Sequence, residues 1–280
     1  MTFGKRLDAA LDARGSLCIG VDPHATLLDA WGLPDDAAGL ARFAEICVEA
    51  FGDLAAVVKP QSAFFERFGS AGIAVLERTI RGCRDTGALV LLDVKRGDIG
   101  STMAAYAEAY LDPSAPLVAD AITVSPYLGV GSLQPVFDLA AEHGAGAFVL
   151  AATSNPEGTQ VQQASIPGGT TVAQAIVDEI AERNAGADPM GSFGIVVGAT
   201  IEPGLLHLEE FNGPILAPGI GAQGGTAEDV RRVFGAALRN VLPNVSREVL
   251  RHGPAVPALR AAAARLVDEF AFLRSILRDE

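Results

Sequence analysis

Residues 88–102 of the chain read ALVLLDVKRGDIGST, an apolar run that ends in closely spaced charges. Ala88–Leu92 is short and continuously apolar, which is typical of a buried strand in a parallel sheet. Asp93 follows it directly, and other apolar runs of the chain end in the same way at a polar residue or a glycine-rich loop. We predict eight strands, over residues 17–21, 55–58, 88–92, 118–124, 147–151, 194–197, 215–217 and 242–245.

Helical patterns separate these runs, with apolar residues at helical spacing in 40–51, 73–83 and 173–180. Buried strands that alternate with helices indicate a parallel sheet, and about eight such units predict an α/β fold of the (β/α)8 TIM-barrel type. An open doubly wound sheet is the alternative. Polar side chains at several strand ends favour the barrel, because its carboxyl strand ends converge on one mouth; these are Asp22, Lys59, Asp93 and Ser125.

The domain organisation is expected to be simple. A chain of 280 residues can form one barrel domain, so we expect a single domain over 1–280. A helix is expected over 257–277, packed on the barrel or on a partner subunit. Residues 153–170, rich in Gly, Gln, Ser and Pro, are expected to form either an ordinary surface loop or a lid.

Composition excludes several classes of protein. With 49% apolar and 20% charged residues the chain can bury a large core, which excludes intrinsic disorder. The net charge of −13 argues against a general nucleic-acid binder, and no apolar run is long enough for a transmembrane helix. Three widely spaced cysteines and four scattered histidines indicate neither a disulfide framework nor a zinc site. We therefore expect a cytoplasmic protein with no membrane or nucleic-acid partner and no bound metal.

The charges after residue 92 indicate chemistry. Asp93 and Lys95 are two apart at a strand end, so their side chains leave on the same side. Asp98 follows, and Lys59 ends another strand. One interpretation is a salt-bridge ring that only closes the barrel mouth. The functional interpretation is that two carboxylates orient a protonated lysine, which then serves as a proton donor.

A second candidate site is the glycine-rich segment Leu216–Thr226, LAPGIGAQGGT. Backbone N–H groups of such a loop can bind an anion, and phosphate commonly binds after strands 7 and 8 of a barrel. Gln223 can add an amide donor, and Arg247 can bind phosphate with two N–H groups. Taken alone, Arg247 is better explained as an ordinary surface arginine.

These motifs resemble a known family. DVKRGDIGST matches the D-x-K-x-x-D-I-x-x-T signature of orotidine 5′-phosphate decarboxylases. The resemblance extends over about 230 residues and is strongest to the longer bacterial subgroup. It is carried by the segments GVDPH (20–24), VVKPQSAFFE (57–66), TVSPYLG (123–129), TSNPEG (153–158) and APGIGAQGG (217–225).

The resemblance implies a barrel homodimer that converts orotidine 5′-phosphate to uridine 5′-phosphate and CO₂, without metal or organic cofactor, in the last step of de novo pyrimidine nucleotide synthesis. It implies that Lys95 donates the proton to C6 of the pyrimidine. Asp93 would lie against the departing carboxylate, and Lys59 would orient Asp93 and contact the ribose.

The resemblance also implies substrate contacts. Asp98, with Ile99 and Thr102, would reach into the site of the neighbouring subunit. The remaining implied contacts are Asp22 to a ribose hydroxyl, Ser125 to the pyrimidine, and Gln223 and Arg247 to the phosphate.

Other functions stay open at this point. Related barrels share the D-x-K-x-x-D core, and some are magnesium-dependent sugar-phosphate decarboxylases. An aldolase needs a lysine with a lowered pKa, which two flanking carboxylates oppose. A non-catalytic nucleotide-binding barrel would not need such crowding of charges.

Overall fold

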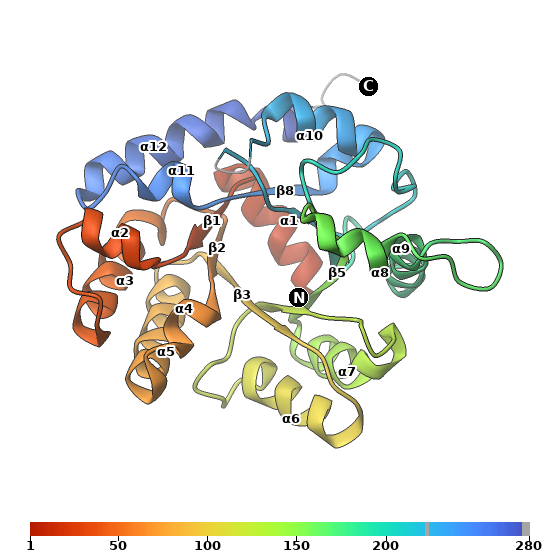
Figure 1. The fold of residues 1–280 in the computed structure, drawn as a ribbon, viewed down its shortest axis with the longest axis horizontal. Coiled ribbons are helices and arrows are strands. Elements are labelled where there is room, and N and C mark those ends of the chain that lie inside the picture. Colours follow the sequence, from red (N-terminus) through yellow and green to blue (C-terminus); the bar gives the residue numbers. More distant parts are fainter. Residues whose placement is uncertain (222–223, 276–280) are drawn as a thin grey trace.

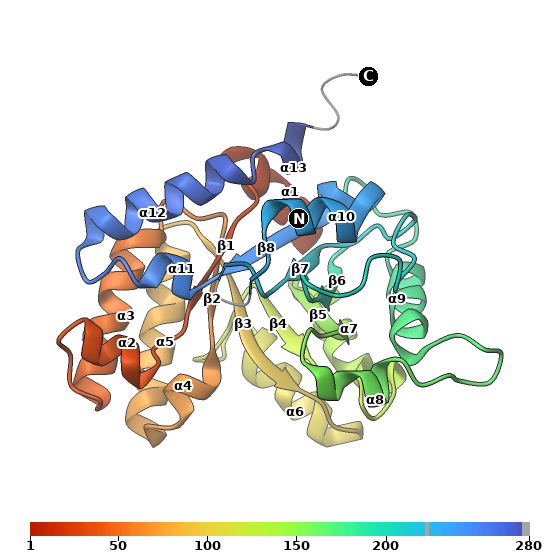
Figure 2. The same cartoon turned by 45° about the horizontal axis from the view of Figure 1, so that its top comes forward.

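The computed structural model describes residues 1–221 and 224–275 of the chain. Eight parallel strands form a closed barrel in sequence order, with β8 pairing back onto β1 through Cys18 and Asn244. Helices surround the strands (Figures 1 and 2). The strands are β1 Cys18–Val21, β2 Val57–Pro60, β3 Leu89–Arg96, β4 Ala121–Val124, β5 Gly146–Ala152, β6 Phe193–Val197, β7 Ile215–Ala217 and β8 Val241–Val245.

The α-helices alternate with the strands as predicted, and short 3-10 turns lie between them. The α-helices are α1 Phe3–Arg14, α2 Ala25–Ala30, α3 Ala37–Phe51, α4 Ser62–Glu66, α5 Gly69–Asp85, α6 Gly100–Leu111, α7 Gln134–His143, α8 Thr159–Gln162, α9 Val172–Arg183, α10 Ala227–Phe234, α11 Arg247–Leu250, α12 Val256–Glu269 and α13 Phe272–Ser275. The 3-10 turns are η1 Val130–Leu133, η2 Pro156–Gly158 and η3 Gly235–Asn240. The predicted barrel is confirmed, and the doubly wound alternative is wrong.

The predicted strands are all present, and their ends differ in two informative places. β3 continues past Asp93 to Arg96, with a register shift against β4 between Leu92 and Arg96. Lys59 lies inside β2 rather than after it. In both cases charged side chains stand on strands, because the upper part of the barrel interior faces a cavity rather than the apolar core.

Helix α1 covers the amino-terminal end of the barrel. Its residues Phe3, Leu7 and Leu11 are buried in one cluster with side chains from inside the barrel. Phe3 meets Phe148 of β5 edge-on, with ring centroids 6.1 Å apart. Because α1 fills this end with apolar side chains, a ligand has access to the barrel only from the opposite, carboxyl end of the strands.

The carboxyl-terminal segment is less regular than predicted. The expected helix over 257–277 is divided into α12 and α13, and residues 276 and 277 lie outside the described residues. Helix α12 packs on α3, with Leu259, Ala262 and Ala263 buried (Figure 2). Among the described residues, no helix is both long and apolar enough to cross a membrane.

Candidate active site

A cavity of about 440 Å³ opens at the carboxyl ends of the strands. Its walls come from strands β2 to β8 and from the segments that follow β1, β2, β5, β7 and β8. Five residues predicted from the sequence line it: Asp22, Lys59, Asp93, Lys95 and Arg247. Three of these are cations and two are carboxylates, so this cavity carries a local excess of positive charge in an acidic chain.

A chain of ion pairs lies at the bottom of the cavity. Lys59 Nζ donates to Asp93 Oδ2 at 2.8 Å, and Lys95 Nζ donates to Asp93 Oδ1 at 2.5 Å. Lys59 and Asp93 are buried, whereas the Lys95 side chain is 46% exposed. The predicted proximity of Lys59, Asp93 and Lys95 is therefore confirmed, and Lys95 is the member that reaches the open part of the cavity.

The surroundings of Asp93 and Lys59 favour the charged form of both side chains. Burial opposes the charge on Asp93, but Lys59 and Lys95 outweigh burial and hold the pKa of Asp93 well below its ordinary value. Burial also works against the charge on Lys59, yet Asp93 and then Asp22 outweigh it and raise the pKa of Lys59 above its ordinary value. Both groups therefore stay charged throughout the physiological pH range.

Two buried oxygens facing the cavity lack a partner among the described residues: Asp22 Oδ1 and Asn244 Oδ1. Buried polar atoms normally have a hydrogen-bond partner, so a pair of orphaned acceptors in a cavity fits hydroxyl or N–H donors of a ligand. Asp22 is one of the predicted contacts. Asn244 is not, because it stands inside an apolar strand where no pattern distinguishes it.

The remaining predicted residues lie elsewhere. Asp98 is half-buried, and its Oδ1 accepts from the N–H of Ile99 at 2.8 Å, while Ile99 and Thr102 are exposed at the start of α6. None of the three lines the cavity of the single chain. Ser125 does not line it either; its backbone N–H donates to the carbonyl of Arg96 at 2.7 Å and holds the end of β3. Gln223 lies outside the described residues.

The glycine-rich loop differs from its expected form. Gly219 and Ile220 line the cavity, but the N–H groups of Gly221, Gly224 and Gly225 donate to carbonyls within the loop. Those three N–H groups therefore stabilise the turn instead of facing an anion. Arg247, exposed beside the cavity and without an ion-pair partner among residues 1–221 and 224–275, is the cation at this side.

A family model described as orotidine 5′-phosphate decarboxylase / HUMPS family matches residues 15–262. The chain belongs to this family. Among similar proteins, orotidine 5′-phosphate decarboxylase of Salinispora arenicola is 65% identical over 266 residues, covering 95% of this chain and 96% of the relative. The enzyme of the same name from Streptomyces coelicolor is 62% identical over 267 residues, covering 95% and 96%. The resemblance seen in the motifs is thereby confirmed.

Solved structures of the family agree with the barrel. A crystal structure from Streptomyces avermitilis is 59% identical with a TM-score of 0.93, covering 98% of this chain and 96% of the other. The OMP decarboxylase of Leishmania donovani is 32% identical with a TM-score of 0.75, covering 98% and 100%. The decarboxylase family therefore supplies both the sequence relatives and the fold of this chain.

Several lining residues of this family member were missed from the sequence. They include His24, Gln61, Thr123, Ser154 and Asn244. Four of them lie inside motifs that carry the family resemblance, so those motifs held a signal for them: His24 in GVDPH, Gln61 in VVKPQSAFFE, Thr123 in TVSPYLG and Ser154 in TSNPEG. Gln61 Oε1 accepts from Lys59 Nζ at 3.2 Å, which adds a second acceptor to that ammonium.

The three cysteines are buried and free, as expected. Burial raises the pKa of the Cys18 and Cys83 thiols to about 12. A thiol that stays protonated is a poor nucleophile, so Cys18 takes no part in chemistry although it lies close to Lys59.

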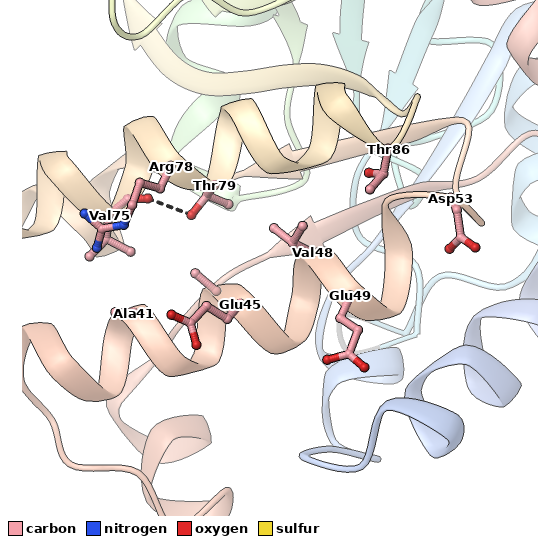
Figure 3. A pocket seen from close by; sticks show the side chains of 10 residues that line it. Ala41, Glu45, Val48, Glu49, Asp53, Val75, Arg78, Thr79 and Thr86 are labelled. Carbon is pink, nitrogen blue, oxygen red and sulfur yellow. Dashed lines mark hydrogen bonds between the residues drawn. The ribbon is translucent and has the colours of Figure 1, made fainter.

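A second cavity, of about 530 Å³, lies outside the barrel between α3 and α5 (Figure 3). Val48 and Val75 contribute apolar surface, and Glu45, Glu49 and Arg78 lie along it. Within the groove, Thr79 donates its hydroxyl to the carbonyl of Val75 in its own helix at 2.8 Å. No catalytic cluster of the kind found at the strand ends lies among its lining residues.

Proposed function

We propose that this chain converts orotidine 5′-phosphate to uridine 5′-phosphate and CO₂, the decarboxylation named for its relatives. The observation that carries the proposal is the charged array Lys59–Asp93–Lys95 at the mouth of a family barrel. This reaction supplies a pyrimidine nucleotide, so its place is the last step of de novo pyrimidine nucleotide synthesis.

The chemistry requires a cation next to one carbon. The bond between C6 of the pyrimidine and its carboxyl carbon breaks, CO₂ leaves, and the electron pair stays on C6. The Lys95 ammonium stabilises this charge and then transfers a proton from Nζ to C6, which leaves a neutral amine that regains its proton from solvent. The half-exposed Lys95 can reach both the substrate and water.

Asp93 and Lys59 prepare this step. Asp93 holds the Lys95 ammonium in place and lies where the substrate carboxylate enters, so that loss of CO₂ relieves a repulsion between two anions. Lys59 neutralises and orients Asp93 from below and can donate to the ribose. The lysine is thus positioned before the substrate arrives.

Substrate contacts follow from the polar lining. Asp22 has an orphaned acceptor for a ribose hydroxyl, and Arg247, together with Gln223, supplies donors for the phosphate. For the pyrimidine, the position of Ser154 in the cavity wall favours it over Ser125. Because phosphate takes no part in bond breaking, its contacts supply binding energy that closes and organises the site; residues 153–170 can then act as a lid.

We propose a homodimer in which Asp98, Ile99 and Thr102 complete the partner's site. The proposed interface is supported by three large apolar side chains that are exposed in the segments after the carboxyl ends of β3 and β4. They are Ile99 (62% exposed), Tyr127 (80%) and Leu128 (51%). Large apolar groups exposed together commonly mark an interface.

The free cysteines suit the reducing cytoplasm, where we place the enzyme. We expect no metal, cofactor, nucleic-acid or membrane partner.

The function is tested by following the loss of orotidine 5′-phosphate absorbance with purified protein, with and without excess chelator. Rapid conversion to uridine 5′-phosphate that the chelator does not slow is expected. Absence of conversion by folded protein would overturn the proposal. In that case turnover of a sugar phosphate, assayed with and without added magnesium, would test the metal-dependent sugar-phosphate branch instead.

The shared site is tested by mixing two inactive variants, Lys95→Ala and Asp98→Ala. In a mixed dimer one of the two sites holds both wild-type residues, so random exchange is expected to restore roughly a quarter of wild-type activity. Each variant alone, incubated in the same way, is the control. No recovery after exchange has been verified by mass would place Asp98 outside the partner's site.

A further inference from the structure

We propose that Thr123 is a positioning residue for the decarboxylation, because its hydroxyl ties the Asp93 carboxylate to the backbone of Lys95. This inference rests on the proposed function and adds a residue to its machinery. Thr123 lies near the end of β4 and lines the cavity, yet it is almost fully buried.

The hydroxyl makes two hydrogen bonds of opposite sense. It donates to Asp93 Oδ1 at 2.8 Å and accepts from the backbone N–H of Lys95 at 2.9 Å. Asp93 Oδ1 also accepts from Lys95 Nζ. Asp93, Thr123 and Lys95 therefore form a closed ring of hydrogen bonds through one carboxylate oxygen, one hydroxyl, one backbone amide and one ammonium.

The backbone of Lys95 needs this support. Its φ is +45°, and among the described residues Lys95 alone has a positive φ without being glycine. A lysine in this region is strained, and strained residues persist only where neighbours hold them. On the far side of Lys95, the N–H of Ser125 donates to the carbonyl of Arg96 at 2.7 Å. Hydrogen bonds to Thr123 and from Ser125, two residues apart at the end of β4, thus restrain the backbone on both sides of the Lys95 side chain.

Only a hydroxyl can serve both partners here. The Lys95 N–H and the Asp93 carboxylate require an acceptor and a donor from the same side chain, and threonine supplies both from one oxygen. Burial and the branched Cβ restrict χ1 and so aim that oxygen. Without it, Lys95 loses a restraint on its strained backbone, and Asp93 loses its neutral donor while keeping the two lysines.

The decisive variant is Thr123→Val, which keeps the shape and removes the hydroxyl. We expect kcat to fall about 10- to 100-fold, the range expected for losing a hydrogen bond to a charged group, with KM within about threefold of wild type. Thr123→Ser keeps the hydroxyl and is expected to recover most of kcat. If the valine variant does not fold, Thr123→Ala removes the hydroxyl without a second methyl and is expected to show the same loss.

A second readout isolates proton transfer. Exchange of the C6 proton of uridine 5′-phosphate in D₂O, followed by NMR, requires the Lys95 amine to reach C6 but involves no loss of CO₂. The hydroxyl-free variant is expected to slow this exchange by a factor similar to the loss in kcat. A role in packing alone would leave the exchange rate of the folded protein unchanged.

Thr79→Val is the matched control, since it removes a buried threonine hydroxyl whose hydrogen bond, among the described residues, stays within α5 (Figure 3). Its kcat is expected to equal that of wild type. Thr123→Val with kcat within twofold of wild type would overturn the inference, as would a serine variant as impaired as the valine variant. An inactive wild-type protein would instead refute the proposed function, so the two failures are distinguishable.

Discussion

Lys95→Ala is expected to lower kcat by at least about 10⁴-fold without unfolding the protein, because it removes the proton donor and the cation beside C6 together. Each contribution alone is commonly worth about 10²-fold or more. The measurement is decarboxylation at saturating substrate, with thermal unfolding of the same preparation.

The fold should tolerate this change. The Lys95 side chain is nearly half exposed, and its loss leaves Asp93 bonded to Lys59 and to Thr123. Alanine at the same φ carries no additional strain, so the end of β3 keeps its path. The unfolding temperature is therefore expected to stay within a few degrees of wild type.

The chain offers a matched control because it has three lysines, at positions 5, 59 and 95. Lys5 is exposed on α1 at the opposite end of the barrel, so Lys5→Ala should be fully active. Lys95→Arg separates two roles, since arginine keeps the charge but does not release its proton; we expect it to be nearly as inactive as alanine. Turnover near the wild-type rate in Lys95→Ala would remove Lys95 from the donor role.

Much of the barrel was predictable because buried strands of a parallel sheet are apolar on both faces. All eight predicted strands exist, and β7 has the predicted ends. The apolar pattern did not predict where a strand ends at the level at which the barrel interior changes from core to cavity. At β3 the apolar run stops at Leu92, whereas backbone pairing continues to Arg96, since hydrogen bonding of the backbone does not depend on apolar side chains.

The site was predictable where charge marks it. The spacing of Asp93 and Lys95 predicted neighbouring side chains, and their atoms are in contact. Asn244 was not predictable, because a single neutral polar residue within a strand is compatible with an ordinary core position. Thr123 begins the motif TVSPYLG, yet its type alone does not distinguish a hydroxyl that bonds a carboxylate from one in an ordinary strand. Asp98 poses a different problem, since its proposed role depends on a second chain, and the geometry of one chain cannot assemble that site.

Asp93→Asn is expected to destabilise the protein strongly, because it leaves the Lys59 ammonium buried without its main counterion. Lys59 and Asp93 are both buried, and breaking such a pair commonly costs about 3–5 kcal/mol, or roughly 10 °C in Tm for a chain of this size. Turnover should fall as well, since the Lys95 ammonium loses the same carboxylate. Chemical denaturation at pH 7 and the decarboxylation assay measure the two effects.

The stability of the wild-type protein should change little with pH around neutrality, as far as Asp93 and Lys59 are concerned. In wild type the pKa of Asp93 is lowered, so its contribution is complete above about pH 4 and declines as the pH falls toward its folded pKa. The pKa of Lys59 is raised, so its contribution is complete below about pH 10 and declines as the pH rises through its folded pKa. These two groups therefore leave wild-type stability nearly flat between those limits.

Asp93→Asn should reverse the direction in which folding shifts the pKa of Lys59. With burial no longer offset by Asp93, the folded pKa of Lys59 drops below its unfolded value, and the unfolded chain then binds more protons than the folded one. The stability of this variant should consequently rise with pH between about pH 7 and 10, where wild type is flat. Asp120→Asn is the control, because its ion-pair partners Arg6 and Arg84 are partly exposed guanidinium groups, which are not deprotonated in proteins, so no rise should follow. A flat profile in Asp93→Asn would mean that Lys59 keeps its charge without Asp93, with Asp22 and Gln61 sufficient to hold it.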